Sequence, residues 1–330
     1  MNPFQDYFLQ WPLHAPPPGF MRDRRLDIAV IRRDVSSASA DIEPQSESSP
    51  VCPDVTDIQS CIEHTVTSGA TGRQHNKQHA YAKINELLKC PLNISIIVLG
   101  LHGSGMTLWY ADRCGVIEVD LGNDKSLWQR AVLGLSNFSV LRDPHVTVHQ
   151  LRPHRIYKFN LYNNVYYGLY GPGGEALYVA DGIVSRGTLV LLGVRAAALS
   201  NDDVVAGFDG APNSEIVAIK LSHPWATEPH RADNTDDVWM LEWQVLQSLK
   251  ECGVRNVPEL VDHIEYDFST KEVREAVGLE DKRHRTRTIL VTQPIADSTL
   301  QNAIECGIEL PTLVQVMKNI IDGMRLFKSR

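Results

Sequence analysis

The sequence lacks the features that mark membrane-spanning, secreted and zinc-binding proteins. No apolar run approaches the ~18–20 residues needed to cross a bilayer. The first residues, MNPFQD, do not join a basic segment to an apolar one, so no secretory signal is visible. None of the six cysteines forms a C-x-x-C pair, the usual zinc or redox motif. We therefore expect an intracellular protein, cytoplasmic or nuclear, with reduced thiols, no membrane partner and no metal site.

Clustered positive charge is also scarce. The chain has 32 Lys and Arg residues against 40 Asp and Glu residues, a net charge of −8. A general nucleic-acid binder needs clustered Lys and Arg to neutralise phosphates, so we expect no nucleic-acid partner. A nucleotide ligand is not excluded, because it needs only a few local donors. The apolar content of 43% and charged content of 22% are those of an ordinary globular protein.

Composition and hydrophobic pattern divide the chain into four segments. Residues 1–77 are rich in Pro and Ser and predict a disordered or weakly ordered tail. Residues 78–175 predict a small β-rich α+β subdomain. Residues 176–296 predict an antiparallel sheet of five strands with one helix, and residues 297–330 predict the first helices of a further lobe, so the fold class is α+β.

Local patterns place elements within the second segment. Helical spacing predicts helices over residues 78–88 and 125–135. Apolar runs separated by glycine-containing turns predict strands over 94–99, 106–111 and 116–119. In the second helix, Leu127, Ala131 and Leu135 are expected to share one face.

The most informative stretch is IVAIK, residues 216–220, a predicted strand that ends in Lys220. A helix is predicted after it, with candidate N-cap residues at 234–236. Glu242 shares a face of that helix with Val238, Val245 and Leu249. A buried carboxylate needs a cation, so the pattern predicts an ion pair between Glu242 and Lys220. The alternative is a solvent-exposed Glu242 beside a stripe of Trp239, Trp243 and Leu246.

The Lys220–Glu242 arrangement is the one that protein kinases use to hold the α- and β-phosphates of ATP. A turn with Gly182 and Gly187 lies between two apolar runs, at the place of a kinase glycine-rich loop. It has fewer glycines than G-x-G-x-x-G. Arg186 in this turn is a candidate phosphate contact, and a plain hairpin is the alternative interpretation.

Two further strands are predicted over residues 257–266 and 288–292, separated by a charged loop over 271–287. The residues after the last strand would form the hinge whose backbone receives an adenine edge. Gln293 and Ile295 are the candidate hinge residues. Helices are then expected from residues 297–300 and over 313–326.

The chain resembles the fungal-type protein kinase domain family over roughly residues 78–330. The resemblance rests on Arg186-Gly187-Thr188, the Lys220 strand, Trp225 and residues 108–115, LWYADRCG. The last of these is similar to the family's L-W-x-x-D-R-S-G hairpin, with cysteine in the serine position. The resemblance implies a kinase N-lobe, with five strands and an αC-type helix, that binds ATP and Mg²⁺ and phosphorylates Ser or Thr of a protein substrate.

The family's catalytic motifs are not found in this sequence. An H-R-D loop should follow a helix like that at 313–330, and a D-x-G metal site should come after it, but the chain ends at residue 330. No catalytic residue can therefore be assigned, and we expect a truncated kinase chain without phosphotransfer and with weak ATP binding. The alternatives are a non-catalytic, pseudokinase-like interaction module and a small-molecule kinase of the aminoglycoside or choline type.

Overall fold

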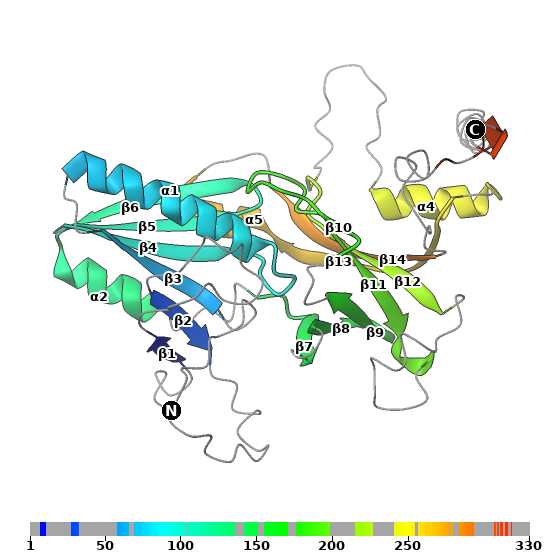
Figure 1. The fold of residues 1–330 in the computed structure, drawn as a ribbon, viewed down its shortest axis with the longest axis horizontal. Coiled ribbons are helices and arrows are strands. Elements are labelled where there is room, and N and C mark those ends of the chain that lie inside the picture. The colour runs from blue at the N-terminus through cyan, green and yellow to red at the C-terminus, as the bar shows by residue number, and fades with distance from the viewer. Residues whose placement is uncertain are drawn as a thin grey trace, which may run out of the picture.

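The computed structural model describes residues 7–10, 28–32, 58–65, 69–103, 105–135, 142–150, 155–170, 176–198, 215–226, 241–254, 257–276, 278–279, 284–293 and isolated positions between 307 and 318. These residues form an α+β structure that is mostly sheet, with two sheets placed end to end along the long axis (Figure 1). The helix start expected at 297–300 lies outside the described residues, as does most of the helix expected over 313–326.

The first sheet has six strands in chain order. They are β1 (Tyr7–Gln10), β2 (Ile28–Arg32), β3 (Ile58–Thr65), β4 (Ile96–His102), β5 (Gly105–Asp112) and β6 (Gly115–Gly122). Neighbours are antiparallel except β3 and β4, which are parallel and joined by helix α1 (Gly69–Leu88), the kind of crossover that parallel pairing requires.

The strands β1–β3 and the start of α1 lie within the segment that was expected to be a weakly ordered tail, so their described residues differ from that expectation. The physical reason is long-range pairing. Ile62 of β3 pairs with Leu99 of β4, and both Cys61 and Ile62 are buried. The sequence around β3 has a low apolar content, so local composition did not predict this strand. Its pairing partner, β4, lies beyond a 20-residue helix in the chain.

Both faces of the first sheet are covered, because alternate residues of a strand point to opposite sides. Ile96 and Val98 of β4 belong to one core cluster with residues of α1. Ile97 and Leu99 belong to another cluster, on the face where α2 (Lys125–Gly134) packs. Figure 1 shows the two helices on opposite sides of the sheet.

Helix α2 begins after Asp124, whose carboxylate accepts hydrogen bonds from the backbone N–H groups of Ser126 and Leu127. The helix has the predicted position, but its buried face differs in one residue. Leu135 is buried and Ala131 packs on the sheet, whereas Leu127 is 38% exposed and Trp128 packs in its place.

The second sheet has eight strands, not the five expected. They are β7 (Val146–Gln150), β8 (Arg155–Leu161), β9 (Asn164–Tyr170), β10 (Tyr178–Val179), β11 (Leu189–Arg195), β12 (Ile216–Ser222), β13 (Glu259–Ser269) and β14 (Thr286–Gln293). The order is β13-β14-β12-β11-β9-β8-β7, with β10 also paired to β11, and all neighbours are antiparallel.

Strands β7–β9 were assigned from sequence to the preceding subdomain, but they extend the sheet that carries Lys220. Leu169 of β9 pairs with Leu192 of β11. Phe159 and Tyr166, from β8 and β9, are fully buried in the same core as Ile219 of β12. The boundary near residue 175 therefore falls inside one sheet and one core.

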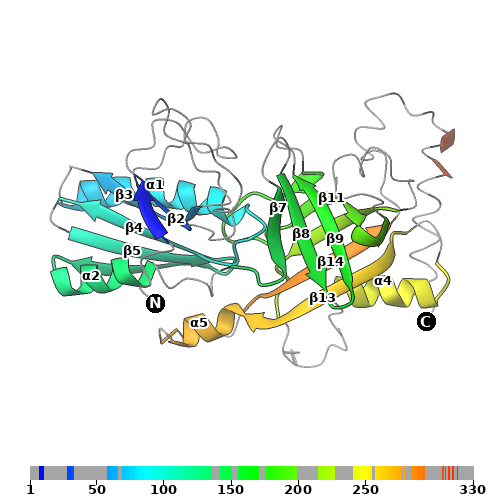
Figure 2. The same ribbon diagram turned by 90° about the horizontal axis from the view of Figure 1, so that it is seen from below.

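Three short helices accompany the second sheet. The 3-10 helix η3 (Ala196–Ala198) follows β11, and helix α4 (Glu242–Glu251) lies between β12 and β13 in the chain. Helix α5 (Thr270–Ala276) follows β13 directly, within the stretch that was expected to be a charged loop. Figure 2 shows α5 and the adjoining end of β13 extending from the second sheet toward the first.

Candidate functional site

The predicted ion pair between Lys220 and Glu242 is present. Lys220 Nζ donates to both carboxylate oxygens of Glu242, at 2.6 Å and 2.7 Å. The two side chains are 26% and 43% exposed, so the pair lies at the surface and not in a core. An exposed pair contributes only about 0–1 kcal/mol to stability. Because the pair is partly exposed, the ammonium group of Lys220 is accessible to a ligand. Because the pair stabilises the protein only slightly, the fold does not depend on it.

Glu242 is the first residue of α4, whereas the sequence placed it further along a helix. Leu241 is the N-cap, with extended backbone angles, and its N–H donates to the side-chain oxygen of Gln244 at 2.8 Å. A carboxylate in the first turn is favourable, because the helix N-terminus carries partial positive charge. The predicted N-cap positions 234–236 lie outside the described residues.

The expectation of a buried apolar stripe on this helix is wrong for its described residues. No residue of α4 is buried, and Val245 and Leu249 are only half-buried, like Trp243 and Leu246. Helix α4 packs on β13, where the indole of Trp243 stacks on the imidazole of His263 with ring centroids 4.4 Å apart. Val238, the remaining member of the predicted stripe, lies outside the described residues, as does Trp239 of the alternative stripe.

The glycine turn connects β10 and β11 and lies close to the first sheet. Gly182 and Gly187 both have positive φ angles, 95° and 53°. The N–H of Gly182 donates to Asn85 Oδ1 of α1 at 3.1 Å, and that of Gly187 donates to Ser185 Oγ at 3.0 Å. Two of the turn's backbone donors are thus already used within the protein.

Arg113, from the turn between β5 and β6, packs directly on this glycine turn. Its Nη1 donates to the carbonyl of Gly182 at 2.9 Å, and its Nη2 donates to the carbonyl of Leu88 at 2.6 Å. A Cβ atom added to Gly187 would lie 2.2 Å from Arg113 Nε. Arg186, the candidate phosphate contact, is exposed, and its carbonyl accepts the N–H of His223 at 2.7 Å.

The other nucleotide-site candidates lie farther along the sheet. Lys220 pairs with Val190 on one side and with Leu290 on the other. Because the strands are antiparallel, the glycine turn before Val190 and Gln293 after Leu290 lie in opposite directions along β12 from Lys220. Gln293 is the last residue of β14 and is half-buried, whereas Ile295 lies outside the described residues.

The LWYADRCG stretch forms the hairpin that its resemblance implied, and its tip joins the two sheets. Asp112 Oδ1 accepts the N–H groups of Cys114 and Gly115 at 2.7 Å and 3.2 Å. Arg274 of α5 donates to the same carboxylate at 2.7 Å and 3.2 Å. This ion pair is buried, since the side chains of Asp112 and Arg274 are 0% and 8% exposed. The hairpin is therefore a structural connection.

A second buried ion pair at the same junction was not found from the sequence. Arg287 Nε of β14 lies 2.5 Å from Asp143 Oδ2, and both side chains are at most 3% exposed. Tyr266 donates its hydroxyl to Asp143 Oδ1 at 2.6 Å, and burial raises the pKa of that hydroxyl. Arg285 and Arg287 are spaced i, i+2, which places them on one face of a strand. That spacing was the feature of the sequence from which these junction arginines could have been predicted.

The remaining resemblance residue, Trp225, also contacts this junction. Its ring lies 3.7 Å from the guanidinium carbon of Arg285, and the residue is 41% exposed. The Sγ atom of Cys114, in the same hairpin tip, lies 3.0 Å from Thr270 Oγ1. Burial raises the pKa of the Cys114 thiol, which disfavours the reactive thiolate.

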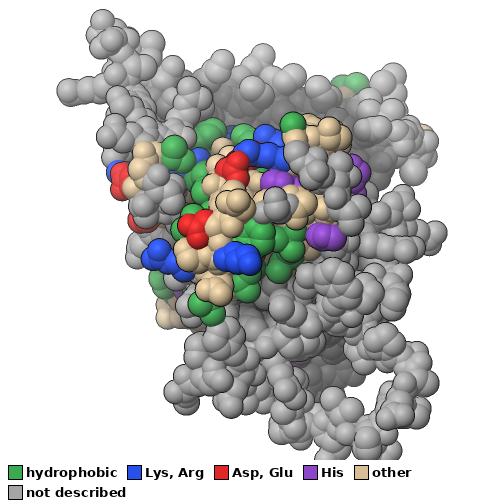
Figure 3. Space-filling model, turned by 90° about the vertical axis from the view of Figure 1, so that its left-hand side faces the viewer, with side chains coloured by type: hydrophobic (Ala, Val, Ile, Leu, Met, Phe, Trp, Pro, Cys, Tyr) green, Lys and Arg blue, Asp and Glu red, His purple; other side chains and the backbone are tan. Residues whose placement is uncertain are grey.

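The outward end of the first sheet carries acidic, basic and histidine side chains close together (Figure 3). On this sheet Arg73 of α1 pairs with Glu118 and Asp120 of β6, and Lys77 also pairs with Glu118. Among the described residues, no group of three or more His, Cys, Asp or Glu side chains is placed to hold a metal ion. No described helix is long and apolar enough to cross a membrane.

Comparisons with models of known families, with curated proteins and with solved structures found no match to this chain.

Proposed function

We propose that the second sheet is a protein-kinase-like N-lobe that binds an adenine nucleotide beside Lys220. The observation that carries this proposal is the contact of Lys220 Nζ with both oxygens of Glu242, at 2.6 Å and 2.7 Å. A lysine held in this way by the following helix is how kinases present a cation to the α- and β-phosphates. The partial exposure of Lys220 leaves room for that contact.

The order of elements supports the proposal. Two strands flank the glycine turn, the lysine strand β12 comes next, helix α4 follows, and β13 and β14 complete the sheet. Along β12, the glycine turn and Gln293 lie on opposite sides of Lys220. A nucleotide with its phosphates at Lys220 would thus have a glycine turn toward one end of the strand and the adenine-binding hinge toward the other.

The proposal covers nucleotide binding and not phosphoryl transfer by these 330 residues. Transfer needs a base or positioning residue for the acceptor hydroxyl, together with carboxylate or amide ligands for Mg²⁺. The sequence has no H-R-D motif, and its one D-x-G tripeptide, Asp120-Leu121-Gly122, lies in β6 of the first sheet, before Lys220 in the chain and not after a catalytic loop. No group among the described residues fits a Mg²⁺ ion, so we assign no step to the metal.

A non-catalytic interaction module, similar to a pseudokinase, is the second candidate. The observation that favours it is the state of the glycine turn. The N–H groups of Gly182 and Gly187 donate to Asn85 and Ser185, and Arg113 packs on Gly187, so this turn has few donors left for phosphate. Leu177, Tyr178 and Val184, on and beside this turn, are 50–64% exposed and would supply apolar contacts to a partner.

A thermal-unfolding titration with Mg-ATP tests the nucleotide proposal. We expect weak binding, with a rise in the melting temperature of about 2–4 °C at several millimolar Mg-ATP, because a ligand that binds only the folded state stabilises it. Lys220→Met should abolish this rise. The matched control is Lys158→Met, which removes a lysine from β8 of the same sheet and should preserve it. A rise that survives in Lys220→Met would contradict the proposal.

A further inference from the structure

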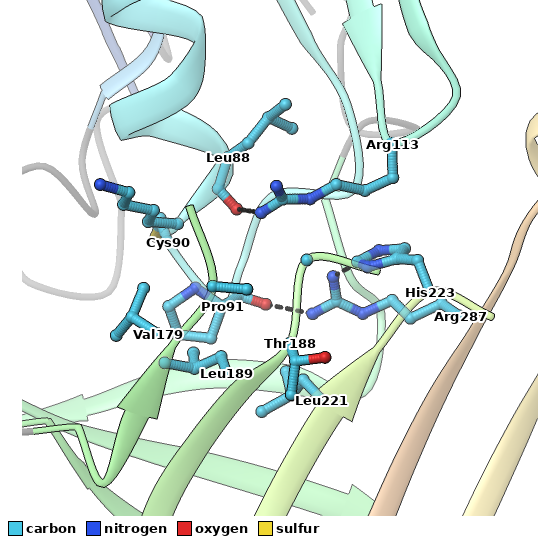
Figure 4. Close-up of a pocket in the computed structure, with 13 residues that line it drawn as sticks. Leu88, Cys90, Pro91, Arg113, Val179, Thr188, Leu189, Leu221, His223 and Arg287 are labelled. Carbon is cyan, nitrogen blue, oxygen red and sulfur yellow. Dashed lines mark hydrogen bonds between the residues drawn. The ribbon is translucent and has the colours of Figure 1, made fainter. Parts of the chain in front are cut away.

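Four side chains that can carry positive charge gather where the two sheets meet, on the face of β12 opposite Lys220. Arg113 comes from the tip of the β5–β6 hairpin, His223 follows β12, Arg285 directly precedes β14, and Arg287 is the second residue of β14. All four are buried, with at most 6% exposure. Figure 4 shows Arg113, His223 and Arg287 around a pocket that Leu88, Pro91 and Thr188 also line.

The buried carboxylates at this junction do not balance the arginines. Asp112 pairs with Arg274 and Asp143 pairs with Arg287. No described carboxylate forms an ion pair with Arg113 or Arg285. Arg113 donates to two backbone carbonyls, while Arg285 donates to the carbonyl of His223 and stacks on Trp225. Two buried guanidinium groups thus form no ion pair with a described carboxylate, an arrangement that is costly without an anion.

Several donors at the junction also lack a partner. Arg113 Nε, Arg285 Nε and His223 Nδ1 are buried without a hydrogen-bond partner. Burial, with Arg287 and Arg285 nearby, lowers the pKa of Arg113 to about 10. Burial and the same cationic surroundings lower the pKa of His223 far below its usual value, so the imidazole is neutral at pH 7. Arg287 Nη1, which can only donate, lies 3.4 Å from His223 Nε2. The imidazole proton is therefore assigned to Nδ1, as a further donor.

We propose that this junction pocket, lined by Arg113, His223 and Arg287, binds a single monatomic anion of the chloride type. The space in this pocket is about that of one water molecule, so a monatomic ion fits it better than a phosphate group does. The anion would balance cations from both sheets, because Arg113 belongs to the first sheet and His223 and Arg287 follow or belong to strands of the second. It would thereby stabilise the contact between them.

Chloride-35 NMR on the intact 330-residue chain tests this directly. We expect excess broadening of the chloride line that saturates, and that bromide removes at lower concentration than phosphate or sulfate does. In parallel, replacing gluconate by chloride at constant ionic strength should raise the melting temperature by about 2–4 °C in a saturable way. Absence of excess broadening in the wild-type protein, or stronger displacement by phosphate than by bromide, would overturn the proposal.

Variants locate the anion. Arg113→Gln should abolish the excess broadening and the chloride-dependent rise in melting temperature, and Arg285→Gln should reduce both. Arg195→Gln is the matched control, because Arg195 on β11 donates to the hydroxyl of Tyr166 and does not line the pocket. Lys220→Met should also keep the chloride response, which separates this site from nucleotide binding. Equal broadening in folded Arg113→Gln and in wild-type protein would contradict the assignment.

Discussion

The exposed Lys220–Glu242 pair and the buried pairs at the sheet junction use the same chemistry for different purposes. Lys220 and Glu242 are 22 residues apart and partly exposed, whereas Asp112 and Arg274 are 162 residues apart and buried. Removing one partner of an exposed pair costs little, while removing one partner of a buried pair leaves an unpaired charge in the interior. The comparison indicates that the junction maintains the fold and that the Lys220 pair is free to serve a ligand.

The largest expected effect comes from breaking a buried pair. Arg287→Met should lower the free energy of unfolding by about 3–5 kcal/mol, because the carboxylate of Asp143 would stay buried without its cation. Urea unfolding measures this loss. Arg73→Met is the matched control, since Arg73 forms two ion pairs at the surface of the first sheet and its loss should cost about 1 kcal/mol or less. Equal losses in the two variants would remove the distinction between the pairs.

A smaller effect is expected where the glycine turn meets Arg113. Gly187→Ala should destabilise the protein by about 2–3 kcal/mol, because its φ angle of 53° disfavours a side chain and the added Cβ would overlap Arg113. Gly122→Ala is the control: its φ angle is 55°, but nothing lies within 4 Å of the added Cβ, so about 1 kcal/mol is expected. A loss in Gly187→Ala no greater than in Gly122→Ala would show that Arg113 does not pack on the turn in solution.

The smallest effect should come from the exposed pair. Lys220→Met is expected to change the free energy of unfolding by about 1 kcal/mol or less, since the pair is partly solvated. Urea unfolding under the same conditions as for Arg287→Met gives the comparison. A loss of about 3 kcal/mol or more would mean that Lys220 is a structural residue like those of the junction.

Local patterns were sufficient to predict the strands on both sides of the short turns and the contact between Lys220 and Glu242. The predicted strand at 216–220 lies within β12, and those at 94–99, 106–111 and 116–119 correspond to β4, β5 and β6. These elements depend on alternation, glycine turns and neighbours close in the chain. The contact between Lys220 and Glu242 was predicted from a buried apolar face that the described part of α4 does not have, so the kinase-like pattern of a strand lysine and a helix glutamate carried the information.

Features that depend on distant partners could not be predicted in this way. Strand β3 is stabilised by parallel pairing with β4 across helix α1, and β9 joins the sheet of Lys220 through β11. Helix α5 lies in a charged stretch whose Arg274 reaches a buried carboxylate far back in the sequence. Neither hydrophobic period nor turn composition reports such contacts, because they are set by tertiary packing.

The most direct test of the central claim is the accessibility of individual lysines to an amine-reactive label, measured by mass spectrometry with and without Mg-ATP. A nucleotide held by Lys220 should decrease the labelling of Lys220 in a dose-dependent way and leave Lys158, on β8 of the same sheet, unchanged. Equal labelling of Lys220 with and without millimolar Mg-ATP would contradict a nucleotide site at this position.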